Sequence, residues 1–142
     1  YAERRAECEA ARVALGVEDL CLADAAAVAR IRALPPQIGR RALHCVSEHR
    51  RSLSAIDALS TEDIRRLGAL MNESHVSMRD DFEMSLPQID ALVADAQQFG
   101  ALGARLTGGG FGGSIVALVA EDHVDAWSRR LVAAHPAAYL IV

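Results

Sequence analysis

The sequence is poor in aromatic residues, which make up 4% of its 142 positions. It has no apolar run that approaches the ~20 residues of a membrane-spanning helix. No lysine or arginine cluster forms the basic stripe that a nucleic-acid backbone requires, and the net charge is −4. The first residues lack the charged and apolar regions of a signal peptide. We therefore expect a cytoplasmic protein without nucleic-acid or membrane partners, with a core built mainly of aliphatic side chains.

Cysteine is also scarce, and no methionine stands at position 1. Cys8, Cys21 and Cys45 are odd in number, widely spaced and outside any CxxC pair. This pattern argues against a disulfide framework and against a zinc site, so we interpret them as buried, reduced thiols. The first residue, Tyr1, suggests that the chain was processed or was cut from a longer protein. The length is that of one ordinary domain.

Apolar periodicity and turn residues divide the chain into helices followed by a short β-rich part. We expect helices over residues 1–15, 24–33, 37–59, 60–80, 87–99 and 122–135. We expect strands over 104–107, 114–120 and 138–142. This order predicts an α+β fold with helices packed on a mostly antiparallel sheet, in a single domain covering residues 1–142.

The apolar residues of the first helix recur at helical spacing and predict its buried face, with Glu and Arg on the remaining face. These residues are Ala2, Ala6, Ala10 and Val13. In the helix over 37–59, the predicted apolar stripe continues to Leu53 and Ile56. Ser60 and Asp122 belong to the residue types that cap helix N-termini, so we expect the next helices to begin there.

Two groups of polar residues could be taken for metal ligands. His44 and His49 lie five residues apart and face different sides of a helix, so we interpret them as hydrogen-bonded histidines. Asp80 and Asp81 could form a magnesium site, because hard cations prefer carboxylates. Adjacent side chains on a helix diverge by about 100°, so we favour a capping or loop-fixing role for both.

The stretch Gly108–Gly113 holds five glycines in six positions, between two predicted strands. Such a run indicates a loop that needs positive φ or a close approach of the backbone. Its glycines fit the dinucleotide pattern GxGxxG, but Ser114–Ala120, a stretch rich in β-branched residues, follows where a helix N-terminus would be needed. The phosphate-binding P-loop pattern also fails, because no Gly-Lys-Ser/Thr closes it. A glycine hairpin without a ligand remains the alternative on composition alone.

Three blocks of the sequence resemble one enzyme family. Gly103–Ser114, GARLTGGGFGGS, resembles the third conserved motif of the GHMP small-molecule kinases, in the form that galactokinases carry. The stretch Leu70–Val93 is similar to a second galactokinase signature, and Tyr1–Cys8 resembles a third. The blocks occur in the family's order and cover most of the chain.

The resemblance implies a fold, an activity and a site. The fold is the ferredoxin-like α/β sandwich of the GHMP kinase C-terminal domain. The activity is transfer of the γ-phosphoryl group of MgATP to the anomeric hydroxyl of α-D-galactose. Tyr1 is implied as a sugar contact. The residues implied to line the active site and its phosphates are Gly108, Gly109, Gly110, Phe111, Gly112 and Gly113.

Other parts of the family pattern have no counterpart in this sequence. The sugar-recognition stretch Arg-x-x-x-Gly-Glu-His, the serine-rich phosphate loop, and the catalytic aspartate with its partner arginine are missing. We therefore expect no catalytic residue and no metal ligand in this chain, which should be inactive alone. ATP and magnesium would be bound mainly by a separate N-terminal domain, on which this one docks. An exposed apolar patch near Tyr1 and the glycine loop could make the chain dimerise.

Three alternatives remain open at this level. The whole protein could be a non-catalytic sensor of sugar and ATP that keeps the same loop. It could be a GHMP kinase acting on another sugar, because related kinases share these blocks. It could also be a stand-alone ferredoxin-like domain that binds a ligand or oligomerises.

Overall fold

The computed structural model describes residues 2–141. The α-helices are α1 (Ala2–Leu15), α2 (Ala25–Arg30), α3 (Pro36–Ser60), α4 (Ile64–Asp80), α5 (Pro87–Gln98) and α6 (Val124–Ala134). The strands are β1 (Gly103–Thr107) and β2 (Ser114–Leu118). Short 3₁₀ turns occupy Leu20–Leu22, Ile31–Ala33 and Glu121–His123. None of the described helices is both long and apolar enough to cross a bilayer.

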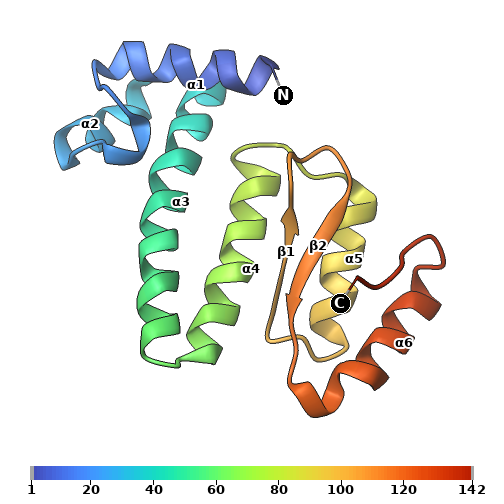
Figure 1. The fold of residues 1–142 in the computed structure, drawn as a ribbon. Coiled ribbons are helices and arrows are strands. Elements are labelled where there is room, and N and C mark those ends of the chain that lie inside the picture. Colours follow the sequence, from blue (N-terminus) through green and yellow to red (C-terminus); the bar gives the residue numbers. More distant parts are fainter. Residues whose placement is uncertain (1, 142) are drawn as a thin grey trace.

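The elements form two packed regions that share the long helix α3 (Figure 1). In the first region, α1, α2 and the 3₁₀ turns Leu20–Leu22 and Ile31–Ala33 lie against the N-terminal half of α3. Its buried apolar residues are Ala11, Leu15, Leu20, Ile31, Ala42 and Val46. In the second region, α4 runs back beside α3, and the β-hairpin lies between α4 and α5, with α6 beyond it. The core of this region includes Met78, Ile89, Val93, Ala104, Leu106 and Trp127.

The strands β1 and β2 form an antiparallel pair in which Gly103 is opposite Leu118 and Thr107 is opposite Ser114. The predicted α+β class, with helices packed on an antiparallel sheet, is confirmed. The predicted strand over 138–142 is wrong for residues 138–141, which have no strand conformation, and Val142 lies outside the described residues. An apolar stretch becomes a strand only where its backbone pairs with a neighbour, and the described sheet contains β1 and β2 alone.

The outer edge of β1 is covered by α4, whose side chains accept the hydrogen bonds of its free amides. Ala104 N–H donates to Asn72 Oδ1 over 2.9 Å, and Leu106 N–H donates to His75 Nδ1 over 3.3 Å. An unpaired strand edge would otherwise expose these groups or bury them without partners. The second signature block therefore supplies the polar groups that attach α4 to the sheet.

Two predicted helix starts are wrong. Ser60 is the last residue of α3, and α4 is capped by Asp63, whose side chain accepts from Arg66 N–H over 3.0 Å. Glu62 has a φ of 56°, so the chain must first turn before the next helix can begin. Asp122 lies within the turn Glu121–His123, and α6 begins at Val124 without a side-chain cap.

The predicted buried face of the first helix is also wrong. The buried residues of α1 are Glu7, Ala11 and Leu15, and the four predicted residues, Ala2, Ala6, Ala10 and Val13, are exposed. Alanine offers little area to bury, so a face with a leucine and a paired carboxylate is the more stable one. In α3, the predicted stripe fails at Leu53 and Ile56, which are 55% and 63% exposed. The described part of the chain places no element over them.

The cysteines and His44 largely follow the sequence interpretation. All three cysteines are free, though half-buried, and the Sγ atoms of Cys8 and Cys45 lie 3.8 Å apart. His44 is buried, stacks on Phe82 with ring centroids 4.4 Å apart, and its Nδ1 lies 3.0 Å from Ser77 Oγ. Ser77 Oγ donates to Asp81 Oδ2, so it accepts from His44 Nδ1–H. His44 is therefore a neutral, hydrogen-bonded core histidine.

This environment predicts a loss of stability in mild acid. Burial lowers the pKa of His44 to about 4 from its ordinary 6.5, against the opposing charge of Asp81. The unfolded state therefore binds a proton first as the pH falls below 6.5, and stability is lost until about pH 4. Between pH 7 and pH 5, the titration of His44 should lower the free energy of unfolding by about 2 kcal/mol. One pKa unit corresponds to about 1.36 kcal/mol.

Urea unfolding of this chain at both pH values measures the effect. His44→Gln should lose about 2 kcal/mol less than the wild type on acidification, because the buried titrating group is gone. The control is His123→Gln, which removes a histidine whose side chain is 73% exposed instead of a buried one. An identical pH dependence in His44→Gln and the wild type would contradict the assignment.

Candidate functional site

The glycine loop, residues 108–113, connects β1 to β2 and has a backbone that most residues cannot adopt. Gly108, Gly110, Gly112 and Gly113 have φ values of 87°, 79°, 123° and 104°. Phe111 also lies in the left-handed region, with a φ of 60°. The predicted need for positive φ is therefore confirmed, and the glycines supply it without steric cost.

One side of the glycine loop lies against the segment that joins α4 to α5. Phe111 N–H donates to the Met84 carbonyl over 2.7 Å. A Cβ atom placed on Gly110 would lie 2.6 Å from Met84 Cε and 3.1 Å from Met84 O. The predicted close approach of the backbone is thus real at Gly110, where no larger residue fits without displacing Met84.

The other side of the glycine loop is open to solvent. Thr107, Gly108, Gly109, Phe111 and Gly113 are all exposed. Within residues 2–141, Phe111 is the loop residue whose amide makes a backbone hydrogen bond outside the strand ladder. Amides left free in such a turn can donate to an anion, as backbone nests do for phosphate groups. The loop is therefore held on one side and offers backbone donors on the other.

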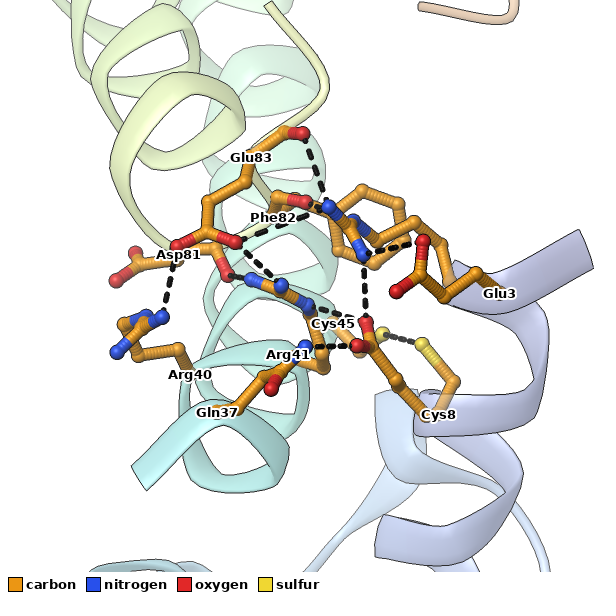
Figure 2. A network of polar contacts seen from close by, with 11 residues as sticks. Glu3, Cys8, Gln37, Arg40, Arg41, Cys45, Asp81, Phe82 and Glu83 are labelled. Carbon is orange, nitrogen blue, oxygen red and sulfur yellow. Dashed lines mark hydrogen bonds and ion pairs between the residues drawn. The ribbon is translucent and has the colours of Figure 1, made fainter. Parts of the chain in front are cut away.

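The segment beneath the loop is fixed by two arginines from the first region of the fold (Figure 2). Arg41 of α3 donates to the Asp81 carbonyl over 2.5 Å and to Glu83 Oε2 over 2.6 Å. Arg4 of α1 donates to the Phe82 carbonyl over 2.7 Å and to the Glu83 carbonyl over 3.3 Å. The carbonyls of three consecutive residues are thus bound just before Met84.

Glu7 of α1 balances these two positive charges. Its Oε2 accepts from Arg41 Nε over 2.7 Å and from Arg4 Nη1 over 3.0 Å, and its Oε1 accepts from Gln37 Nε2. Burial alone would raise the pKa of Glu7, but the hydrogen bond and charge of Arg41, with those of Arg4, keep it below its ordinary value. Hydrogen bonds to Arg41 and Arg40 likewise lower the pKa of Glu83. Both carboxylates are therefore ionised at neutral pH.

Sequence reasoning missed the buried part of this cluster. Arg4 is one of the Arg residues assigned above to the unburied face of the first helix, yet its side chain is 12% exposed and pairs within the chain. Arg41 is fully buried, and Glu7 is 9% exposed. A signal was present, because Arg4 and Glu7 share a helix face with Ala11 and Leu15 at spacings of three and four. A sequence pattern assigns charged residues to the solvent-exposed face of a helix. Only the ion-pair partner on another helix, which the pattern does not reveal, shows that such residues can be buried.

The remaining predicted site residues are placed as follows. Tyr1 lies outside the described residues, so its role as a sugar contact stays a prediction. Asp80 pairs with the exposed Arg79 over 2.7 Å, and Asp81 accepts from Ser77 over 2.8 Å at the end of α4. These contacts agree with a loop-fixing role for Asp81. Among residues 2–141, no three His, Cys, Asp or Glu side chains gather as a set of metal ligands.

Sequence comparison supports the resemblance of the three blocks. The family described as "GHMP kinases C terminal" matches residues 55–137. Galactokinase of Actinobacillus succinogenes is 48% identical over 141 residues, which cover 94% of this chain and 36% of that protein. Galactokinase of Chloroflexus aurantiacus is 45% identical over 141 residues, covering 93% of this chain and 36% of its own length. The chain thus spans about a third of the length of the curated relatives that it matches.

Solved structures agree with the sequence comparison. Galactokinase of Lactococcus lactis, complexed with galactose, is similar with a TM-score of 0.80 and 34% identity, over 92% of this chain and 36% of that one. The mevalonate kinase of L. major, in complex with R-mevalonate, is similar with a TM-score of 0.62 and 29% identity, over 84% of this chain and 37% of that one. Because the family match covers more than half of the residues, this chain belongs to the GHMP kinase family and corresponds to its C-terminal domain.

Proposed function

We propose that this chain is the C-terminal part of a cytoplasmic galactokinase, which transfers the γ-phosphoryl group of ATP to the anomeric hydroxyl of α-D-galactose. The support is the identity of 48% with a galactokinase over 94% of this chain. The similarity to a galactokinase that holds galactose points the same way. The single structural observation that carries the proposal is the glycine loop, which is fixed on one side and open on the other.

In this proposal, the glycine loop supplies backbone N–H donors near the phosphates of ATP. Phosphoryl transfer leaves little covalent work to the protein, so positioning and stabilisation of negative charge dominate catalysis. Backbone donors held in a fixed turn provide both, and they need no reorganisation as charge develops on the transferred group. Tyr1 would contact the sugar, since a phenol can donate to a hydroxyl while its ring packs on an apolar sugar face.

The rest of the reaction would depend on a second domain. The similarity to galactokinases implies that Mg²⁺ and most of the ATP would be held by an N-terminal domain, against which this one would dock. Bound Mg²⁺ neutralises charge on the β- and γ-phosphates. The family's catalytic aspartate has no counterpart in this sequence, so the chain alone should be inactive.

ADP release by the full-length gene product, with MgATP and a panel of sugars and mevalonate, tests the proposal. Turnover that requires galactose and is absent from the 142-residue chain alone is the expected result. Turnover with another member of the panel would assign a different GHMP kinase. Galactose binding without any ADP release would contradict catalysis and indicate a sensor.

A further inference from the structure

The glycine loop depends on contacts that begin far from it in the structure. Its Phe111 amide is bound by the Met84 carbonyl, and its Gly110 lies against the Met84 side chain. Leu86 Cδ1 would lie 3.7 Å from a Cβ placed on Gly112. Three successive loop residues, Gly110, Phe111 and Gly112, therefore lie against the segment 84–86. We expect a movement of that segment to displace the loop.

The segment before Met84 lies outside regular secondary structure, although the amides of Asp81, Phe82 and Met84 donate back to carbonyls of the last turns of α4. It follows the end of α4, and Glu83 has a φ of 51°, in a region that most side chains disfavour. Arg4 and Arg41 bind the carbonyls of residues 81–83 and thereby oppose relaxation of this turn. A guanidinium presents several donors in one rigid plane, so each arginine fixes more than one acceptor at once.

The three signature blocks meet in this arrangement. Arg4 belongs to the first block, the segment 81–86 to the second and the glycine loop to the third. Glu7 binds both arginines and so holds α1 and α3 in one position relative to the segment. The contacts form one continuous path from α1 and α3 to the loop.

We infer that Arg4 and Arg41 are positioning residues of the kinase site, acting through residues 81–84 to fix the glycine loop. The inference rests on the proposed function, because the loop is taken to bind ATP phosphates. Neither arginine contacts the loop itself in the described structure. Their contribution is geometric, and a misplacement of about 1 Å at a reacting site can lower rates by about a hundredfold.

Arg4→Gln in the full-length gene product is the variant of choice, because Arg4 is partly exposed whereas loss of Arg41 removes a fully buried charge. Two quantities are measured: hydrogen exchange of the Phe111 amide, and kcat/KM for MgATP at saturating galactose. We expect exchange at Phe111 to become about tenfold faster, since the opening of the loop would no longer be resisted by a fixed Met84 carbonyl. We expect kcat/KM for MgATP to fall by about tenfold or more.

Arg12→Gln is the matched control. Arg12 lies on the same helix, pairs with Glu9 and donates to the Val17 carbonyl, but it has no contact with residues 81–86. It should leave Phe111 exchange and kcat/KM for MgATP unchanged. Exchange in α5 and α6 should stay at the wild-type level in both variants, which separates loss of loop position from general loosening of the fold.

The outcomes separate the two proposals. An active wild type whose Arg4→Gln variant keeps both Phe111 exchange and kcat/KM would overturn the positioning role and leave the kinase assignment intact. An inactive wild type, with Phe111 exchange still accelerated in Arg4→Gln, would overturn the kinase assignment. It would leave intact the conclusion that Arg4 helps to fix the position of the glycine loop. Equal acceleration in α5, α6 and the loop would also overturn the inference, because it would mark a general structural role.

Discussion

Arg41→Met is expected to lower the free energy of unfolding of this chain by about 3 to 5 kcal/mol, the usual cost of removing one partner from a buried ion pair. Arg41 is fully buried and binds Glu7, Glu83 and the Asp81 carbonyl. Methionine fills much of the same space but provides no donor. The carboxylate of Glu7, which is 9% exposed, would then keep only Arg4 and Gln37 as partners.

The free energy of unfolding is measured by urea titration of the wild type and the variant. Glu7→Gln combined with Arg41→Met should recover part of the loss, because the unpaired charge is removed together with its partner. Arg12→Met serves as control, since its pair with Glu9 is exposed and its loss should lower the unfolding midpoint far less than the loss of Arg41. A single variant Arg41→Met as stable as the wild type would show that the buried charges do not support the fold.

The glycine loop is the part of the site that could be predicted from sequence. Five glycines among six residues indicate backbone with positive φ or a close approach of the backbone to a neighbouring segment. Gly110 shows both, with a φ of 79° and a close contact to Met84. The approximate positions of most helices are also encoded locally, by the spacing of apolar residues and by turn residues such as Gly16, which follows α1 with a φ of 65°, and Pro36, the first residue of α3. These signals act over a few residues and do not depend on what packs against them.

Features that depend on distant partners could not be predicted in this way. The buried face of α1 is decided by Arg41, which lies 34 residues from Glu7 along the chain. The exposure of Leu53 and Ile56 depends on which elements reach the C-terminal half of α3. The predicted strand over 138–142 has suitable composition, but strand formation requires a paired edge. In each case the local sequence pattern is compatible with the predicted feature. The outcome depends on a distant segment, which the local pattern does not contain.

The contact between α4 and β1 is the other feature hidden from the sequence, because it depends on two glycines that lie far apart along the chain. Gly68 in α4 and Gly103 in β1 let the two backbones approach so closely that a Cβ on Gly68 would lie 2.5 Å from the Leu102 carbonyl oxygen. A Cβ on Gly103 would lie 2.4 Å from the Gly68 oxygen. The hydrogen bonds from β1 to Asn72 and His75 require this short separation.

Gly68→Ala should therefore destabilise the chain by about 3 kcal/mol or more, although alanine is the better helix former by about 1 kcal/mol. The obstructing atoms are backbone, so relief requires that α4 and β1 move apart and weaken the bonds to Asn72 and His75. Urea unfolding measures the loss, with Gly109→Ala as control, because a Cβ there meets no atom within 4 Å. A Gly68→Ala chain that is more stable than the wild type would mean that helix propensity outweighs the contact, and that α4 does not approach β1 this closely.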